Sequence, residues 1–344
     1  MKNTHKTPRR NKILRIFACF LILAGFSSFA QRPPDLWPPI EPFKTDYLPV
    51  SPIHSLYYEE CGNPNGKPVF VLHGGPGGGS SPYMRRFFNP KVFHIVLHDQ
   101  RGCGKSVPYA DIRENTTANL VEDIEALRKH LNLGPIILFG GSWGATLALA
   151  YAETYPENVS GIVIRGVFLG TWEEINHFYH GGVSLFFPEV YEKLLAAVPD
   201  SIKKPLPQIL YQNMRKADSQ GKYNLCKAWV RYEAKISQLS ITDEEVEGFL
   251  KNYDPTAFGL LENYYMANYC FLEENQLLNN SDKLLHIPTI IINGRYDMVC
   301  PPISAYRLHK KLPQSKLVIV EGAGHWMGDK PIEEALLKAM KEFE

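Results

Sequence analysis

Residues 135–151 constrain the fold more than any other part of the sequence. They read PIILFGGSWGATLALAY, a short apolar run, a turn with a serine between glycines, and a second apolar run of helical composition. Glycines on both sides of Ser142 permit a sharp turn from a strand directly into a helix. The stretch therefore predicts a buried strand, a tight turn that lifts the Ser142 hydroxyl clear of a sheet, and a helix whose N-terminus favours nearby negative charge. A chance glycine-rich turn is the alternative, and the strand and helix patterns on either side argue against it.

Similar short apolar runs recur along the chain, mostly rich in Val and Ile and ending at turn residues. They lie at 69–73, 93–98, 135–139, 162–168, 289–293 and 316–320. Between two of them, apolar residues recur at helical spacing from Leu120 to Leu131, and Gly134 ends the pattern. Apolar strands that alternate with helices are typical of an α/β fold, with a mostly parallel central sheet covered by helices on both faces.

Residues 170–279 interrupt this alternation. They are rich in aromatic residues, mostly helical in pattern, and contain no convincing buried strand. We expect them to form a helical cap inserted into an α/β core whose two parts span 44–169 and 280–344. Residues 31–43 are rich in proline and predict an extended linker or surface arm.

The first 30 residues have the layout of a secretory signal peptide. Six of the 37 basic residues of the chain lie there without any acidic residue, and an almost unbroken apolar run follows at 16–26. Residues 28–30 form a small-x-small cleavage signal, and the apolar run is short for a bilayer span. We expect residues 1–30 to direct export to the periplasm or the exterior. An uncleaved membrane anchor is the alternative.

The composition beyond the leader argues against several classes of function. Residues 31–344 retain 31 basic residues against 36 acidic ones, a net charge of −5, so no basic stripe is available to bind nucleic acid. Five widely scattered cysteines without a CxxC motif predict neither a disulfide framework nor a zinc site. His177 and His180 have no carboxylate at metal-ligand spacing. We expect no metal and no cofactor.

The segment DQRGCGKS at residues 99–106 ends like a phosphate-binding loop. In such a loop the opening position is a glycine that turns the backbone toward phosphate. Here that position is Asp99, whose carboxylate would repel phosphate, and Pro108 stands where the following helix should begin. The segment therefore does not predict nucleotide binding.

The Ser142 hydroxyl requires a base, and the base requires an orienting acid. In folds that carry such a serine turn, the partners follow in the order Ser, Asp, His, each after a late strand. Asp297 and His325 occupy these positions. We expect Asp297 to hold His325 at Nδ1, so that Nε2 takes the proton from Ser142. His98 is the competing base, but it precedes the serine and fits a structural role better.

A second glycine-rich segment, HGGPGGG, begins at His73 directly after a predicted strand. This is where an oxyanion-binding loop belongs in such folds. We expect the backbone N–H groups of Gly75 and Trp143 to form the oxyanion hole, since glycine lets the backbone approach a substrate closely. A dinucleotide-binding loop does not fit, because no helical run opens from these glycines.

Five motifs together resemble a known family. HGGPGGG, DQRGCGKS, GGSWGATLALAY, GRYDMVCP and GAGH follow in an order and at intervals similar to those of prolyl aminopeptidases (proline iminopeptidases), serine peptidases of the α/β-hydrolase fold. The resemblance runs from about Tyr57 to the C-terminus. It implies release of N-terminal proline from peptides through an acyl-enzyme on Ser142. It also implies that 99–106 is a structural loop braced by hydrogen bonds of Asp99 and Arg101.

Two segments of the predicted cap resemble the family's amine-binding motifs, AWVRYE, which ends at Glu233, and LLENYY, which contains Glu262. The resemblance implies that Glu233 and Glu262 bind the α-ammonium of a peptide whose N-terminal proline is free. Without it, both would be read as solvated helix residues. A carboxylate among aromatic side chains is costly unless a cation pairs with it. Four further aromatic residues are expected to line the proline pocket, namely Phe186, Phe187, Tyr264 and Tyr265.

The sequence departs from the family pattern at two places. Trp326 stands where a serine commonly follows GAGH, and Asn268-Tyr269-Cys270 replaces small residues. The alternative function is an esterase or lactonase with a broad apolar pocket, because a triad alone does not distinguish an ester from a peptide. A catalytically silent binding protein is a third possibility, which the intact triad argues against. Many relatives resemble cytoplasmic enzymes, so a cytoplasmic location stays open beside export, and the sequence does not predict an oligomeric state.

Overall fold

The structure is a computed structural model, and it describes residues 35–198 and 206–344. The predicted signal peptide, residues 1–30, lies outside the described residues. The described part of the proline-rich segment lies along the core. The N–H of Trp37 donates to the carbonyl of Arg86 (2.9 Å), and the Arg85 guanidinium donates to the carbonyl of Ile40 (2.9 Å).

Eight strands form one sheet in the order β1-β2-β4-β3-β5-β6-β7-β8. Their bounds are β1 Lys44–Pro49, β2 Ser55–Gly62, β3 Lys67–Leu72, β4 Phe93–His98, β5 Ile136–Ser142, β6 Val159–Val167, β7 Thr289–Gly294 and β8 Lys316–Val320. β1 and β2 pair antiparallel to their neighbours, and all the other pairs are parallel. The mostly parallel sheet confirms the predicted α/β class.

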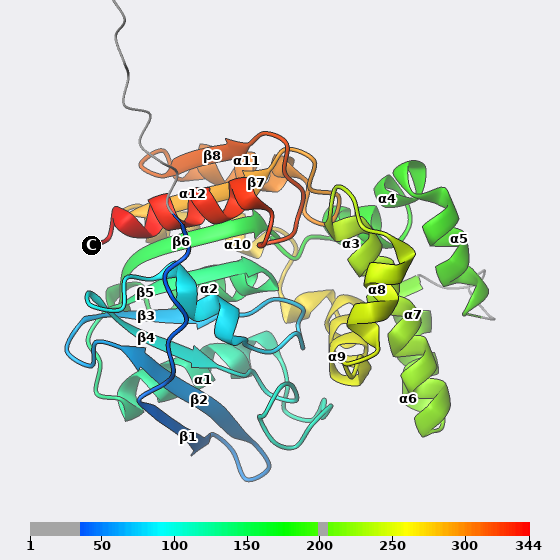
Figure 1. Cartoon of the computed structure of the whole chain (residues 1–344), viewed down its shortest axis with the longest axis horizontal. Coiled ribbons are helices and arrows are strands. Elements are labelled where there is room, and N and C mark those ends of the chain that lie inside the picture. Colours follow the sequence, from blue (N-terminus) through cyan, green and yellow to red (C-terminus); the bar gives the residue numbers. More distant parts are fainter. Residues whose placement is uncertain (1–34, 199–205) are drawn as a thin grey trace, which may run out of the picture. The chain divides into compact units, whose positions relative to one another are not determined.

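Helices cover both faces of the sheet (Figure 1). They are α1 Thr117–His130, α2 Trp143–Thr154, α11 Pro302–Lys311 and α12 Lys330–Lys341. In β3 the side chains of Phe70 and Leu72 join the core cluster that contains α1, α2 and α11. The alternate residues Val69 and Val71 join the opposite cluster, which contains α12. Both faces of the strand are therefore buried, as its continuous apolar run predicts.

Within residues 168–198 and 206–288, the chain between β6 and β7 forms helices joined by loops and contains no strand. It holds α3 Trp172–Tyr179, α4 Gly182–Phe186, α5 Pro188–Ala196, α6 Leu206–Lys216, α7 Ser219–Ser237, α8 Asp243–Leu250, α9 Thr256–Ala267 and α10 Gln276–Asn279. Figure 1 shows α3 to α9 gathered beside the sheet, with the chain returning through α10 to β7. The start of α9 approaches the glycine-rich loop after β3, where a Cβ placed on Gly77 would lie 2.8 Å from the carbonyl oxygen of Ala257. Within residues 35–198 and 206–344, no helix combines the length and apolarity that crossing a bilayer requires.

The carboxyl group of Glu153 lies near the C-terminal end of α2. It is buried, and hydrogen bonds within the protein replace only part of its contacts with water. One oxygen accepts from the Asn280 amide (3.3 Å), and the other has no hydrogen-bond partner in the described part of the chain. Burial raises the pKa of Glu153 from 4.5 to about 7. The folded protein therefore binds a proton at the Glu153 carboxyl group more tightly than the unfolded chain does. The contribution of this protonation to the free energy of unfolding is complete below pH 4.5 and is lost as the pH rises through 7.

We therefore expect Glu153→Gln to be more stable than the unmodified protein at about pH 8, by roughly 2–3 kcal/mol. Below the ordinary carboxyl pKa the two should unfold alike, because the carboxyl group is then neutral in both states. Urea unfolding at several pH values measures the difference. An equal dependence on pH in the two proteins would show that this carboxyl group titrates normally.

Candidate active site

Ser142 lies at the end of β5, and α2 begins at the next residue. Its backbone has φ +58° and ψ −128°, a sparsely populated conformation for a non-glycine residue. The turn closes so tightly that a Cβ on Gly140 would overlap the carbonyl oxygen of Gly144, and one on Gly144 would overlap that of Leu72. Only glycine fits at these two positions, which explains why the serine lies between glycines.

The His325 imidazole and the Asp297 carboxylate form a buried hydrogen-bonded pair. His325 Nδ1 donates to Asp297 Oδ2 at 2.7 Å, and both side chains are buried. The other oxygen of Asp297 accepts from the backbone N–H groups of Val299 (3.0 Å) and Cys300 (2.7 Å). These donors stabilise the ionised carboxylate, and the carboxylate keeps the proton on Nδ1. Nε2 is therefore the nitrogen available to accept a proton.

A bulge in β6 brings this pair to the end of the strand that carries Ser142. Ser142 pairs with Val167, and the register shift beside it leaves Gly166 as the extra residue, at φ +52°. A Cβ on Gly166 would lie 3.0 Å from His325 Cε1 and 3.2 Å from Asp297 Oδ2. The structure thus gathers Ser142, Asp297 and His325 at the carboxyl ends of β5 and β6, as parallel strands permit.

The loop of His325 is held from two sides. Arg165 Nη1, from β6, donates to the His325 carbonyl at 2.6 Å. On the other side, the backbone N–H groups of His325 and Trp326 both donate to the carbonyl of Ser237 at the end of α7, at 2.9 and 3.0 Å. The candidate base is therefore fixed by both a core strand and a helix of the inserted segment.

Two backbone segments flank the Ser142 hydroxyl. A Cβ on Gly74 would lie 3.9 Å from Ser142 Oγ, so the loop after β3 passes beside the hydroxyl. Gly75 follows with φ +114°, a conformation that favours glycine. On the other flank Trp143 is the first residue of α2, where backbone N–H groups have no intrahelical acceptor. Gly75 and Trp143 therefore lie on the two segments that flank the hydroxyl, and their role as oxyanion donors stays a prediction.

The 99–106 loop braces its surroundings as the resemblance implies. Asp99 accepts from the backbone N–H and the hydroxyl of Ser80 (both 2.7 Å) and from the N–H of Lys105 (2.7 Å). Arg101 donates two hydrogen bonds to Asp123 on α1, each 2.7 Å long. The Asp99 carboxylate, which would repel the phosphate of a nucleotide, thus connects two loops of the protein.

Sequence reasoning did not single out Gln100, which links the loop after β3 to the start of α2. Its backbone N–H donates to His73 Nε2 (3.0 Å), and its amide group donates to the His73 carbonyl (2.9 Å). Its amide oxygen accepts from Trp143 Nε1 (2.9 Å). Gln100 therefore fixes both segments that flank Ser142. No sequence signal marks this role, because it arises only when β3, β4 and β5 lie side by side.

The other histidines have structural surroundings. Burial lowers the pKa of His98 to about 4, so its imidazole stays neutral. His177 Nε2 contacts the carbonyl of Met298 at 2.8 Å, and His180 Nε2 accepts from the backbone N–H of Leu206 at 3.3 Å. Each of these rings is accounted for by local packing.

Glu233 on α7 and Glu262 on α9 form a carboxyl pair. Glu262 is 2% exposed, and its Oε2 accepts from Trp229 Nε1 at 2.6 Å. Burial raises the pKa of both groups, and the neighbouring charge of Glu233 raises that of Glu262 further. Both carboxyl groups therefore keep a proton to a higher pH than an isolated glutamate does. Glu233 Oε2 is buried and has no hydrogen-bond partner among the described residues, which suits this carboxylate oxygen to pair with a cation.

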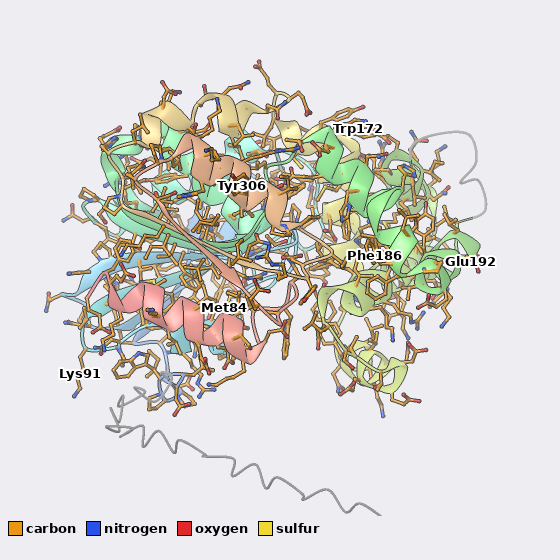
Figure 2. The ribbon with its side chains drawn as sticks, turned by 90° about the horizontal axis from the view of Figure 1, so that it is seen from above. Met84, Lys91, Trp172, Phe186, Glu192 and Tyr306 are labelled. Atoms are coloured by element: carbon orange, nitrogen blue, oxygen red, sulfur yellow. The ribbon has the colours of Figure 1, made fainter. Side chains whose placement is uncertain are left out.

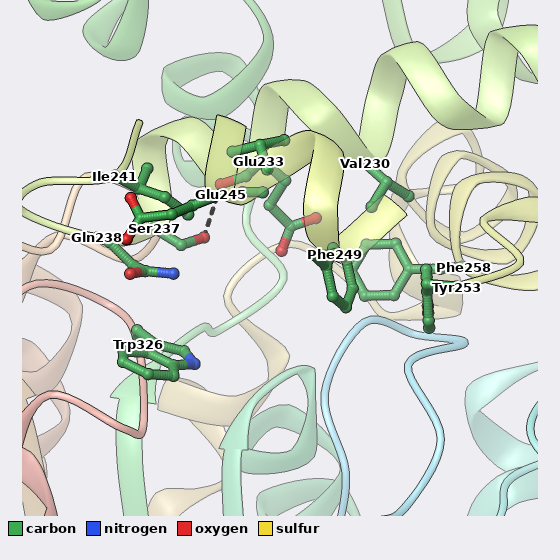
Figure 3. Close-up of a pocket in the computed structure, with 12 residues that line it drawn as sticks. Val230, Glu233, Ser237, Gln238, Ile241, Glu245, Phe249, Tyr253, Phe258 and Trp326 are labelled. Carbon is green, nitrogen blue, oxygen red and sulfur yellow. Dashed lines mark hydrogen bonds between the residues drawn. The ribbon is translucent and has the colours of Figure 1, made fainter. Parts of the chain in front are cut away.

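A cavity of about 470 Å³ lies against Glu233, as Figure 3 shows. Four of its lining residues, Val230, Glu233, Ala234 and Ser237, have the spacing of one helix face on α7. The remaining lining residues are Gln238, Ile241, Glu245, Val246, Phe249, Tyr253, Phe258 and Trp326. Because Trp326 follows His325 directly, the cavity connects the carboxyl pair with the loop of the candidate base.

The four aromatic residues expected to line a proline pocket do not line this cavity. Phe186 on the short helix α4 is 66% exposed and lies on the surface in Figure 2. Tyr265 is buried with its ring 4.7 Å from that of Trp143. Their apolar character was visible in the sequence, but the neighbours of each ring were not. The lining residues Phe249 and Phe258 were missed for the same reason.

Known proteins are similar to this chain in sequence and in fold. A family model described as alpha/beta hydrolase fold matches residues 67–330. A probable proline iminopeptidase of Leptolyngbya boryana is 45% identical over 309 residues, which cover 90% of this chain and 96% of the relative. The proline iminopeptidase of Arabidopsis thaliana is 42% identical, covering 90% and 82%. The chain belongs to the proline iminopeptidase family.

Membership of the proline iminopeptidase family accounts for motifs spread over the whole core. The proline iminopeptidase of Neisseria gonorrhoeae, 44% identical, likewise covers 88% of this chain and 97% of its own. Among solved structures, a bromoperoxidase from Bacillus anthracis superposes with a TM-score of 0.61 at 22% identity, covering 87% of this chain and all of the other. A proline iminopeptidase-related protein from Thermus thermophilus gives 0.57 at 21%, covering 87% and 97%. At this identity the structures show the α/β-hydrolase fold alone.

Proposed function

We propose that the protein is a prolyl aminopeptidase that releases proline from the free N-terminus of peptides. The observation that carries this proposal is the free carboxylate oxygen of Glu233 beside a cavity that reaches the loop of His325. A hydrolase of neutral esters has no use for such a charge, whereas an exopeptidase must bind an ammonium group at a fixed distance from its nucleophile. The names of the proline iminopeptidase relatives support the same activity.

In the proposed reaction Ser142 Oγ attacks the carbonyl carbon of the prolyl residue, while His325 Nε2 takes the hydroxyl proton. Asp297 stabilises the imidazolium that forms, through the 2.7 Å hydrogen bond to Nδ1. The N–H groups of Gly75 and Trp143 stabilise the oxyanion. His325 then gives the proton to the leaving amine, the peptide bond breaks, and a prolyl ester remains on Ser142. A water molecule that His325 deprotonates hydrolyses this ester and restores the hydroxyl.

The substrate amine would bind the carboxyl pair. The ring nitrogen of an N-terminal proline is protonated at neutral pH and carries two N–H bonds. One can meet Glu233 Oε2, which has no hydrogen-bond partner within residues 35–198 and 206–344. The cation also favours the ionised form of both carboxyl groups, because an adjacent positive charge lowers a carboxyl pKa. An N-terminal ammonium would thus supply the cationic partner that the carboxyl groups of Glu233 and Glu262 need.

We also propose that residues 1–30 are removed on export and that 170–279 act as the cap over the active site. The first part is tested by expression of the whole chain in a bacterium and N-terminal sequencing of the exported protein. The sequence should begin at Gln31. A protein retained in the cytoplasm with Met1 intact would contradict export.

The proposed activity predicts a strong preference for one amide substrate. The chain from Gln31 onward should hydrolyse prolyl arylamide with a kcat/KM well above that for alanyl and leucyl arylamides and for short acyl esters. Initial rates on this panel measure the preference. Faster hydrolysis of the esters, with arylamides cleaved slowly whatever their N-terminal residue, would favour the esterase alternative.

A further inference from the structure

Trp326 presents a half-exposed indole to the cavity that Glu233 also lines. Figure 3 shows it across the cavity from Glu233 and Ser237 on α7. We propose that Trp326 forms a subsite for the side chain of the second residue of the peptide, and that this subsite selects apolar and aromatic side chains over acidic ones. The inference rests on the proposed function, because it assumes that proline is the first residue.

The position of the second residue follows from the chemistry of the leaving group. The amine that His325 Nε2 protonates is the backbone nitrogen of the second residue, so this nitrogen must come within about 3 Å of Nε2. The ammonium of the first residue binds at Glu233, against the helix α7. The peptide therefore runs from α7 past the imidazole. Trp326 follows His325 directly and is the large side chain next to the leaving residue.

The indole of Trp326 is held in place by the backbone around it. The N–H of Trp326 donates to the carbonyl of Ser237 (3.0 Å), and its own carbonyl accepts from the N–H of Asp329 (3.1 Å). The six-membered ring lies over Gly328, where a Cβ would come within 2.5 Å of Cζ2. Gly328 thus leaves room for the indole, although 48% of the residue is exposed. A fixed aromatic surface of this kind binds another ring with little loss of conformational entropy.

The rest of the cavity wall decides which side chains fit. Its apolar part comprises Val230, Ile241, Val246, Phe249, Tyr253 and Phe258. Of the described residues that line it, Glu233 and Glu245 are charged and none is a Lys or Arg. An aromatic side chain can pack against Trp326, whereas a carboxylate would lose water and meet two acids. The volume of about 470 Å³ lies in the range of pockets that hold ligands larger than one proline ring.

The test compares proline release from Pro-Phe-NH₂, Pro-Gly-NH₂ and Pro-Asp-NH₂. We expect kcat/KM for the Phe peptide to exceed that for the Gly peptide about tenfold, and the Asp peptide to be the poorest. Trp326→Ser should abolish the preference for Phe over Gly, measured within the variant as the ratio of kcat/KM for the two peptides. Gly328→Ala should weaken the preference in the same way, because the added methyl group displaces the indole. Trp326→Phe should keep most of it.

Phe186→Ser is the matched control, since it removes an exposed aromatic side chain that does not line the cavity. It should keep the full preference for Phe. An unchanged Phe-to-Gly ratio in Trp326→Ser would overturn the subsite, and so would release of proline from all three peptides at equal rates by the unmodified protein. Failure to release proline from any of the peptides would overturn the proposed function itself, so the two failures are distinguishable.

Discussion

Replacement of Ser142 by alanine should lower kcat on prolyl arylamide by about 10⁶-fold, the loss seen when a triad serine is removed from other serine peptidases. The reason is that Ser142 carries the hydroxyl that lies at the end of β5 between the two flanking backbone segments. Burst and steady-state kinetics measure the effect. KM should change little, because the ammonium site is untouched.

Ser142→Gly provides a matched control for strain. Alanine keeps a Cβ at φ +58°, whereas glycine adopts this conformation freely. Both variants should be equally inactive, while the glycine variant should be more stable than the alanine variant by about 1 kcal/mol in urea unfolding. Turnover in either variant within tenfold of the unmodified rate would show that Ser142 is not the nucleophile.

Glu233→Gln should lower kcat/KM on prolyl arylamide by about 10²–10³-fold, equivalent to roughly 3–4 kcal/mol. The substitution keeps the shape of the side chain but removes the negative charge of the pair and its free carboxylate oxygen. Glu262→Gln should cost less, because Glu262 does not line the cavity and an amide oxygen can still accept from Trp229 Nε1. Kinetics at saturating and low substrate concentration separate binding from turnover.

Glu244→Gln is the control for this charge change. Glu244 is an exposed acid on the neighbouring helix α8 and does not line the cavity. Its replacement removes the same charge from the same part of the molecule and should change kcat/KM by less than about twofold. If Glu233→Gln and Glu244→Gln behaved alike, the carboxyl pair would have no specific part in substrate binding.

The parts of this site that sequence could predict are those set by local chemistry. The turn around Ser142 forms where glycine alone fits, and the chain shows that pattern directly. Asp297 and His325 follow late strands, and the parallel order of those strands brings their ends to one edge. β1 and β2 were both missed, because β1 is an exposed edge strand without an apolar alternation and the acids Glu59 and Glu60 interrupt the apolar run of β2.

The rest depends on contacts between elements that are distant in sequence. The bulge at Gly166 makes room for the His325 ring, yet Gly166 reads as an ordinary glycine within an apolar run. The cavity forms because one face of α7 meets the loop of Trp326. Helical spacing predicts which residues share one face of α7, but it does not predict which residues lie opposite that face. For this reason the sequence predicts Phe186 in the pocket and does not predict Phe258 there.

The proposed prolyl aminopeptidase activity requires recognition of a protonated N-terminus beside a serine nucleophile. The most direct measurement compares kcat/KM for prolyl arylamide and N-acetylprolyl arylamide, which differ in the charge of the ring nitrogen and one acetyl group. Hydrolysis of the free amine should be faster by at least about 10²-fold, and Glu233→Gln should reduce that ratio. Equal rates on the two substrates would contradict the account.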